Sequence, residues 1–279
     1  MKIDLVFITY NRLDYTKLSL ASVLADPTEE FALTIWDNAS TDGTSEYFYS
    51  VKDPRIVEKV FSKDNVSLRG AVNYLFDKSS ADLVGIIPND FIVKPGWTRP
   101  LAQAHADIPE LGIIGCWHFF PEDFHYERAK HKIQRFGRHQ VLRHPWTGGG
   151  AGLVKLKTIR ECGPLQSSAT TAYWIQMALR GYINGFYFPL IFVEHLDDPR
   201  SKHSRLKSMP FGEAYKYCPA YQTGKMKNLQ ECDRLHQEIL DNLLSGPYDP
   251  KYYCGWRAKV RRGLLKIRSP LDSLRQKIL

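Results

Sequence analysis

The sequence predicts an α/β fold with a doubly wound, mostly parallel (Rossmann-like) sheet and a helical C-terminal extension. Two observations predict it. Short apolar runs alternate with segments whose apolar residues recur at helical spacing, and polar residues follow the runs. With 279 residues, 43% of them hydrophobic and 24% charged, the composition is that of a globular protein and excludes a disordered or fibrous chain.

The alternation is clearest in the first half of the chain. We predict strands over 3–9, 31–36, 56–61, 82–87 and 111–116, and helices over 12–25, 66–77 and 97–107. The run IDLVFIT (3–9) is almost continuously apolar, as expected of a parallel strand buried on both faces. The segment DNASTDGT (37–44) is a cluster of polar turn residues.

The second half is less regular. Residues 117–147 are rich in His, Arg and aromatics, and we interpret them as an insertion or a substrate loop that either lines an acceptor groove or lies on the surface. A Gly-rich turn follows at 147–152, with a helix predicted over 173–181 and a strand or hairpin over 183–193. Helices with polar connections are predicted from about residue 210.

The excess positive charge lies in a C-terminal tail. Residues 255–279 hold eight Lys or Arg and one acid, so they carry +7 of the net charge of +8. Apolar residues recur there at helical spacing, which predicts a basic amphipathic helix. Such a helix either binds an anionic membrane surface or packs on the domain with its charges in solvent. Nucleic-acid binding is not expected, because aromatic stacking residues are not interleaved with the basic ones.

Several classes of protein are excluded. The longest apolar block, 186–193, contains Pro189 and falls short of the ~18–20 residues of a membrane span. The start of the chain has no cleavage site of the secretory type, so we expect no signal peptide. Five scattered cysteines predict neither a disulfide framework nor a zinc knuckle and suit a reducing compartment.

Polar side chains gather where the predicted strands end, at 9–12, 37–38 and 89–90. Ligands of doubly wound sheets bind outside the carboxyl ends of the strands, so these residues are candidates for a binding site. A carboxylate such as Asp37 can accept hydrogen bonds from a nucleobase or a ribose, and turn amides can bind anions. The alternative is that these residues only cap the following helices.

These segments resemble a known family. TYNR (9–12) and DNASTDGT (37–44) are similar to the corresponding segments of the nucleotide-sugar-dependent glycosyltransferases of family two, which have a GT-A fold. The resemblance continues in the same order over roughly residues 1–200. Its further segments are 65–73, IIPNDFIVKPGW (86–97), TGGGAGLVKLKTIRECG (147–163), YWIQMALRGY (173–182) and FPLIFVEHLDD (188–198).

The resemblance implies a GT-A domain over 1–208, with a nucleotide-binding half (1–116) and an acceptor and metal half (117–208), followed by the helical extension 209–279. It implies transfer of a sugar from a nucleotide diphosphate, with UDP favoured, to a saccharide acceptor of a surface polysaccharide or lipid-linked glycan. The expected location is the cytoplasm, either free or with the tail on the inner membrane face. A non-catalytic nucleotide-sugar or glycan-binding protein on the same fold is the alternative. A nucleotidyltransferase is disfavoured, because ITYNRLDYTK (8–17) has no Gly to grip a triphosphate.

Site residues follow from the same resemblance. Asp90 and His195 are the implied ligands of Mn²⁺ or Mg²⁺. The implied nucleotide-binding residues are Thr9, Tyr10, Asn11, Arg12, Asp37, Asn38, Asn65, Gly70, Asn73 and Asn89. Arg200, Lys202 and Arg205 form an implied diphosphate loop, and Trp146, Gly148 and Gly149 face the acceptor.

The sequence departs from the family's pattern twice. The metal motif Asp-x-Asp reads Pro88-Asn89-Asp90, so the first carboxylate is missing and a weaker metal site is expected. The general base expected near Thr171 is also missing. Asp197 and Asp198 are the proposed substitutes, with Glu161, Glu122 and Asp123 as further candidates. A retaining mechanism, or a chain that binds nucleotide but transfers poorly, also remains open.

Overall fold

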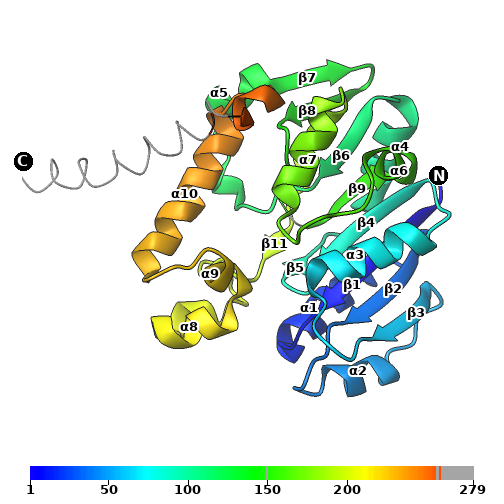
Figure 1. Ribbon diagram of the computed structural model, residues 1–279, viewed down its shortest axis with the longest axis vertical. Coiled ribbons are helices and arrows are strands. Elements are labelled where there is room, and N and C mark those ends of the chain that lie inside the picture. Colours follow the sequence, from blue (N-terminus) through cyan, green and yellow to red (C-terminus); the bar gives the residue numbers. More distant parts are fainter. Residues whose placement is uncertain (149, 256–257, 259–279) are drawn as a thin grey trace, which may run out of the picture.

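Within residues 1–148, 150–255 and 258, which the computed structural model describes, a mixed sheet of nine strands forms the centre of the fold (Figure 1). The strand order is β3-β2-β1-β4-β9-β6-β10-β8-β7. The strands are β1 (Ile3–Thr9), β2 (Ala32–Asp37), β3 (Ile56–Phe61), β4 (Leu83–Pro88), β6 (Leu111–Gly115), β7 (Ile133–Phe136), β8 (His139–Arg143), β9 (Gly152–Lys155) and β10 (Ile183–Phe188). A separate ribbon pairs β5 (Phe91–Ile92) with β11 (Glu194–His195).

The predicted α/β fold class is confirmed. Strands β3, β2, β1 and β4 are parallel neighbours, and β6 is parallel to β10. Strand β9 runs antiparallel between β4 and β6, and β8 and β7 continue the sheet as antiparallel pairs. Thr9 pairs in register with Asp37, so the polar ends of β1 and β2 lie side by side as expected.

Helices cover both faces of the sheet. Helices α1 (Leu13–Val23), α2 (Thr44–Ser50) and α4 (Thr98–Asp107) pack on one face, and α3 (Ser67–Lys78), α6 (Leu156–Cys162) and α7 (Thr170–Leu179) on the other. Along β1, Leu5 and Phe7 enter the first core while Val6 and Ile8 enter the second. Because successive residues of a strand point to opposite faces, burial on both faces accounts for the continuous apolar run.

Two segments differ from the sequence-based expectation. Residues 117–147 are not simply an insertion or loop: after a short α5 (Tyr126–Ala129) they form β7 and β8, which extend the main sheet. Val141 and Leu142 are both fully buried, on opposite faces, although their neighbours in sequence are polar. The polar turn segment 37–44 leads directly into a helix: its last residue, Thr44, is the first residue of α2, in which Phe48 is buried.

Helices beyond about residue 210 are present as predicted. They are α8 (Phe211–Tyr217), α9 (Pro219–Thr223) and α10 (Leu229–Ser245), and in Figure 1 they lie on the side of the molecule away from the N terminus. The C-terminal turns of α10 place Leu240, Leu243 and Leu244 against Trp117, Phe119, Leu142 and Phe186. Most of the predicted amphipathic tail, 256–257 and 259–279, lies outside the described residues.

Two findings bear on the excluded classes. All five cysteines are free, as their scattered positions predicted. Within the part of the chain that the structure describes, no helix is long and apolar enough to cross a bilayer.

A buried lysine joins α10 to the sheet. Lys132 is fully buried; its Nζ lies 2.9 Å from His144 Nδ1 and donates a hydrogen bond to the carbonyl oxygen of Leu243 at 2.5 Å. Burial disfavours the charged ammonium and lowers the pKa of Lys132 to about 7, from an ordinary value of 10.5.

Replacing Lys132 by Met is expected to change how stability depends on pH. Between about pH 7 and 10 the unfolded chain holds the Lys132 proton more often than the folded protein does. The stability of the wild type should therefore rise with pH relative to Lys132→Met, by up to about 1.4 kcal/mol per pH unit. Urea unfolding at several pH values measures this slope. Lys130→Met, at an exposed neighbouring position, is the control, and parallel curves for wild type and Lys132→Met would contradict the expectation.

Candidate active site

The implied metal ligands meet at the carboxyl ends of the strands. Asp90 follows β4, and His195 ends β11, which pairs with β5 so that His195 stands opposite Phe91. The Leu196 amide donates to the Asp90 carbonyl at 2.8 Å, and the His195 ring stacks on the Phe91 ring at 4.8 Å between centroids. This ribbon brings His195 Nε2 to 3.9 Å from Asp90 Oδ2.

A second acid joins this pair. One ligand atom from each of Asp90, His195 and Asp197 lies within 4.8 Å of the other two. Asp90 Oδ1 is buried and has no hydrogen-bond partner, so one carboxylate oxygen of the group is available to a cation. Two carboxylates and an imidazole suit Mn²⁺, and Mg²⁺ is also compatible when water and phosphate complete its shell. The residues therefore fit a divalent metal, and Asp197 supplies the second carboxylate that Asn89 lacks.

Arg12 lies against both acids. Its Nη1 donates to Asp197 Oδ1 at 3.0 Å and Oδ2 at 2.9 Å, and its Nη2 donates to Asp90 Oδ2 at 3.1 Å and Asn89 Oδ1 at 3.0 Å. The guanidinium also lies 5.3 Å from the ring centroid of Tyr15 and 5.7 Å from that of Tyr217 in α8. The side chain of Arg12 is only 8% exposed, so this is a buried ion cluster.

The backbone that directs Arg12 inward is strained. Asn11 and Arg12 have φ angles of 54° and 61°, in the left-handed region that costs non-glycine residues about 1–3 kcal/mol each. Hydrogen bonds hold this turn: the Asn11 amide donates to Ser40 Oγ at 2.7 Å, and the Thr41 amide donates to Asn11 Oδ1 at 2.8 Å. The end of β1 is thereby tied to the loop after β2.

Asn89, where the family pattern has an acid, supports the same turn. Its Nδ2 lies within 2.9–3.0 Å of Thr9 Oγ1, Thr16 Oγ1 and the carbonyl oxygen of Asn11. A carboxylate at this position could not donate to that carbonyl oxygen. The missing first acid is therefore explained by a donor that fixes the turn carrying Arg12.

The charges shift the pKa values of the group. Burial raises the pKa of Asp90, but the contact with His195 and the charge of Arg12 outweigh it and hold that pKa below its ordinary range. Burial lowers the pKa of His195, whereas the Asp90 carboxylate raises it to a net value above the ordinary one. Burial alone would lower the pKa of Arg12, and Asp197 and Asp90 raise it beyond its usual range.

A second charged cluster lies beside the first. Arg200 donates to both oxygens of Asp123 at 2.7–2.8 Å and to both oxygens of Asp198 at 2.7–3.1 Å. His236 of α10 lies with Nε2 at 3.8 Å from Asp198 Oδ2. His236 is not among the residues predicted from the sequence, because no local motif connects it with Asp198. In the predicted diphosphate loop, Arg205 pairs with Asp14 at 3.1 Å and Lys202 is exposed.

Several predicted nucleotide residues have structural partners. Asp37 is 1% exposed, and its carboxylate accepts from the Ser40 amide at 3.1 Å and from Ser45 Oγ at 2.5 Å. Asn38 Oδ1 accepts from the Trp36 indole at 3.1 Å. Tyr10, by contrast, is 46% exposed at the end of β1. The nucleotide role of these residues stays a prediction.

The predicted nucleotide residues near α3 also make structural contacts around that helix. Asn65 Oδ1 accepts from the Ser67 amide at 2.9 Å, in the first turn of α3. Gly70 leaves no room for a side chain, because a Cβ there would collide with Val66. Asn73 exchanges two hydrogen bonds with the backbone of Leu165, at 3.0 and 2.8 Å. This exchange joins α3 to the segment where a general base was expected.

Two of the predicted acceptor residues, Trp146 and Gly148, lie on the segment between β8 and β9. Gly148 has a φ of 81°, and a Cβ there would come within 2.9 Å of the His118 ring. Trp146 packs with its ring 4.6 Å from that of His144. Gly149 lies outside the described residues. Thr171 is exposed in the first turn of α7.

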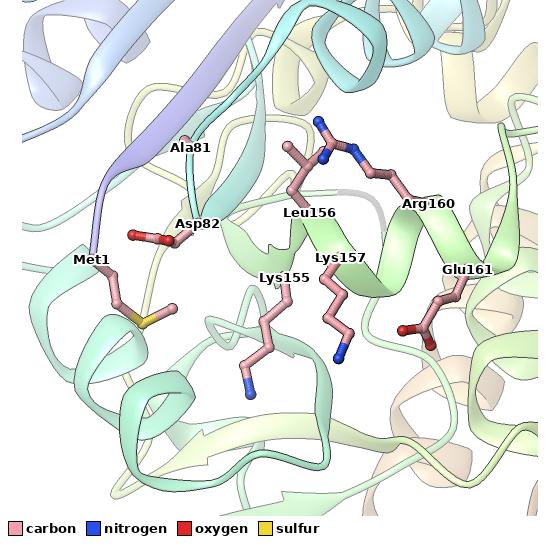
Figure 2. Close-up of a pocket in the computed structure, with 8 residues that line it drawn as sticks. All are labelled: Met1, Ala81, Asp82, Lys155, Leu156, Lys157, Arg160 and Glu161. Carbon is pink, nitrogen blue, oxygen red and sulfur yellow. The ribbon is translucent and has the colours of Figure 1, made fainter.

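A surface hollow elsewhere excludes one candidate base. It is lined by Met1, Ala81, Asp82, Lys155, Leu156, Lys157, Arg160 and Glu161 (Figure 2). Met1 precedes β1 and Asp82 precedes β4, so the hollow lies at the amino ends of these strands, opposite to Asp90. Glu161 therefore cannot act at the Asp90 group.

Part of the chain matches a known protein family. Residues 4–156 match the model of the family described as glycosyl transferase family 2. Validoxylamine A glucosyltransferase of Streptomyces hygroscopicus subsp. limoneus is 26% identical over 153 residues, which are 52% of this chain and 34% of that protein. The chain thus spans about a third of the length of this relative.

Solved structures show the same fold. The mannosyltransferase PcManGT of Pyrobaculum calidifontis, in complex with GDP-Man and Mn²⁺, aligns with a TM-score of 0.58 at 16% identity, covering 90% of this chain and 84% of that one. TarS of S. aureus aligns with a TM-score of 0.51 at 13% identity, covering 67% of this chain and 35% of that one. At these identities the likeness is one of fold alone.

The buried ion pair predicts a large loss of stability on substitution. Asp197→Asn leaves Arg12 with one carboxylate in a buried site and should lower the free energy of unfolding by about 3–5 kcal/mol. Asp241→Asn breaks the exposed pair with Arg128, at 2.8 Å, and should cost less than about 1 kcal/mol. Urea unfolding of both variants compares the two losses, and equal losses would show that the Arg12 cluster is no more important than a surface pair.

Proposed function

The chain belongs to glycosyl transferase family 2, and from that premise we propose that it transfers a sugar from a nucleotide-diphosphate donor, with a divalent metal held by Asp90, His195 and Asp197. The observation that carries this proposal is the grouping of these three side chains within 4.8 Å, with the buried Asp90 Oδ1 unpartnered. They meet at the carboxyl ends of parallel strands, where sheets of this kind bind ligands.

Each group has a defined task in this proposal. A divalent metal bound there would neutralise the negative charge that develops on the leaving diphosphate. Asp90, His195 and Asp197 would hold it. Arg200, Lys202 and Arg205, on the loop after β11, would bind the diphosphate oxygens. Tyr10, Asn11 and the turn after β2 would border the nucleoside. Asp37 would fix that turn by accepting a hydrogen bond from the Ser40 amide.

The proposed bases are not free. Arg12 contacts both oxygens of Asp197, and Arg200 both oxygens of Asp198. Either acid could accept a proton from the acceptor hydroxyl only after its arginine has moved. A retaining reaction, in which the leaving diphosphate itself assists the incoming hydroxyl, needs no such movement and is the alternative mechanism. The same contacts support the second candidate function, a nucleotide-sugar or glycan-binding protein without catalysis.

We propose the donor and the acceptor only by their chemical class. The proposed donor is a UDP-sugar. A GDP-sugar is the second candidate, because the mannosyltransferase with the same fold was solved with GDP-Man. The proposed acceptor is a saccharide of a surface polysaccharide or lipid-linked glycan. The proposed location is the cytoplasm, with the tail 255–279 at the inner face of the membrane.

Nucleotide binding is expected to need both Mn²⁺ and Asp90. A nucleotide at about 100 times its Kd should add about 2.7 kcal/mol, a rise of several degrees in Tm. Thermal unfolding with UDP, GDP, dTDP and CMP, each with and without Mn²⁺, measures this. Asp90→Asn should abolish the Mn²⁺-dependent rise, and Asp77→Asn on the surface of α3 should keep it. A rise that survives Asp90→Asn would contradict the proposed metal site.

Transfer itself separates the two candidate functions. UDP- and GDP-sugars are incubated with Mn²⁺ and a panel of saccharide acceptors, and release of the free nucleotide diphosphate is followed together with the product. Product formation eliminates the non-catalytic reading. Nucleotide-sugar binding without product from any acceptor would favour it.

The basic tail is expected to bind anionic membranes. Residues 255–279 carry +7, and each basic residue near an anionic surface contributes about 1 kcal/mol. The full chain should float with vesicles containing phosphatidylglycerol, and a chain ending at residue 254 should not. Vesicles of phosphatidylcholine alone are the control. Equal flotation of both chains would discard the membrane role of the tail.

A further inference from the structure

We infer that Arg12 competes with the divalent metal for the carboxylates of Asp90 and Asp197 and thereby sets how tightly the metal binds. The inference rests on the proposed function, because it concerns the same metal site. It adds a role at the metal site to the nucleotide contact expected of Arg12 from the sequence.

The hydrogen bonds show where the competition would arise. Arg12 Nη1 contacts both oxygens of Asp197, and Nη2 contacts Oδ2 of Asp90. Of the carboxylate oxygens in the group, only Asp90 Oδ1 has no hydrogen-bond partner. A metal that uses all three ligands must therefore share Asp197 with the guanidinium or displace it.

The charges act in the same direction. Asp90, Asp197 and Arg12 together carry −1 (−1 − 1 + 1) when His195 is neutral, and the two acids alone carry −2. Their side chains are only 4–15% exposed, so water and salt screen the repulsion between guanidinium and metal poorly. A dication is drawn more strongly to a group of charge −2 than to one of −1.

The Arg12 side chain also has contacts outside the two acids. The guanidinium carbon lies 5.3 Å and 5.7 Å from the ring centroids of Tyr15 and Tyr217, the left-handed turn at Asn11 and Arg12 directs the side chain inward, and Asn89 Oδ1 accepts from Nη2. Once a metal takes Asp197, the freed planar fork has the geometry to bind a diphosphate in two-point contact. Arg12 would thus pass from the acids to the donor as the metal binds.

Mn²⁺ affinity tests the inference directly, without an activity assay. Free Mn²⁺ is followed by electron paramagnetic resonance during titration of the full chain. Arg12→Gln should bind Mn²⁺ about tenfold more tightly than the wild type, within the usual range of coupling between sites. Arg12→Lys keeps the charge but loses the two-point contacts, so its affinity should lie between those of the wild type and Arg12→Gln. Arg55→Gln, which breaks a pair with Asp53 outside the site, is the control and should change nothing.

The outcomes are separable. Mn²⁺ binding by Arg12→Gln that is equal to or weaker than that of the wild type overturns the inference and leaves the proposed metal site intact. Mn²⁺ binding by Arg12→Gln but not by the wild type supports the inference. Binding by neither overturns it together with the metal site, and nucleotide binding then reports separately on the donor site.

A folding defect would not remove the test. If Arg12→Gln does not fold alone, because two buried acids lose their counter-charge, Mn²⁺ in the refolding buffer should restore the native circular dichroism. Failure of Mn²⁺ to restore it, in a variant whose far-ultraviolet spectrum remains unfolded, also overturns the inference.

Discussion

The arrangement of the site depends on the buried ion cluster of Arg12 with Asp197 and Asp90. Without a counter-charge, two acids that are 4% and 15% exposed would be too costly to keep ionised in the folded protein. Arg12 supplies that charge from a turn 185 residues away in sequence from Asp197. The cluster therefore joins the end of β1, the end of β4, the loop after β11 and, through Tyr217, helix α8. Tyr217 of α8 and His236 of α10 thus bring two C-terminal helices into contact with the charged residues of the site.

The sheet explains why these segments meet. Strands β1 and β4 are parallel neighbours in register, so Thr9 and the residues after Pro88 lie at the same end of the sheet. The short β5–β11 ribbon then returns a late segment of the chain to that end and sets His195 opposite Phe91. A left-handed turn at Asn11 and Arg12, held by Asn89 and Ser40, completes the geometry. The strain in that turn is offset by the contacts that it makes possible.

The sequence was informative where the pattern is local. Apolar runs located β1, β2 and β4, and the motif around Asp90 and the segment before His195 located two members of the group. It was uninformative where a contact spans the chain: the pairing of Arg12 with Asp197, and of Asp198 with His236, has no periodicity or spacing to reveal it. The β7–β8 hairpin was missed for another reason, since the buried Val141 and Leu142 sit among polar and basic neighbours that are typical of a loop.

Anomalous diffraction from crystals soaked with Mn²⁺ and UDP or GDP would show whether Asp90, His195 and Asp197 form the metal centre of a donor site. We expect an anomalous peak within ligand distance of Asp90 and His195, next to the nucleotide diphosphate, with the Arg12 guanidinium turned from Asp197 toward a phosphate. Nucleotide bound at the ends of β1 and β4 with no peak at this group, or a peak at another part of the molecule, would contradict it.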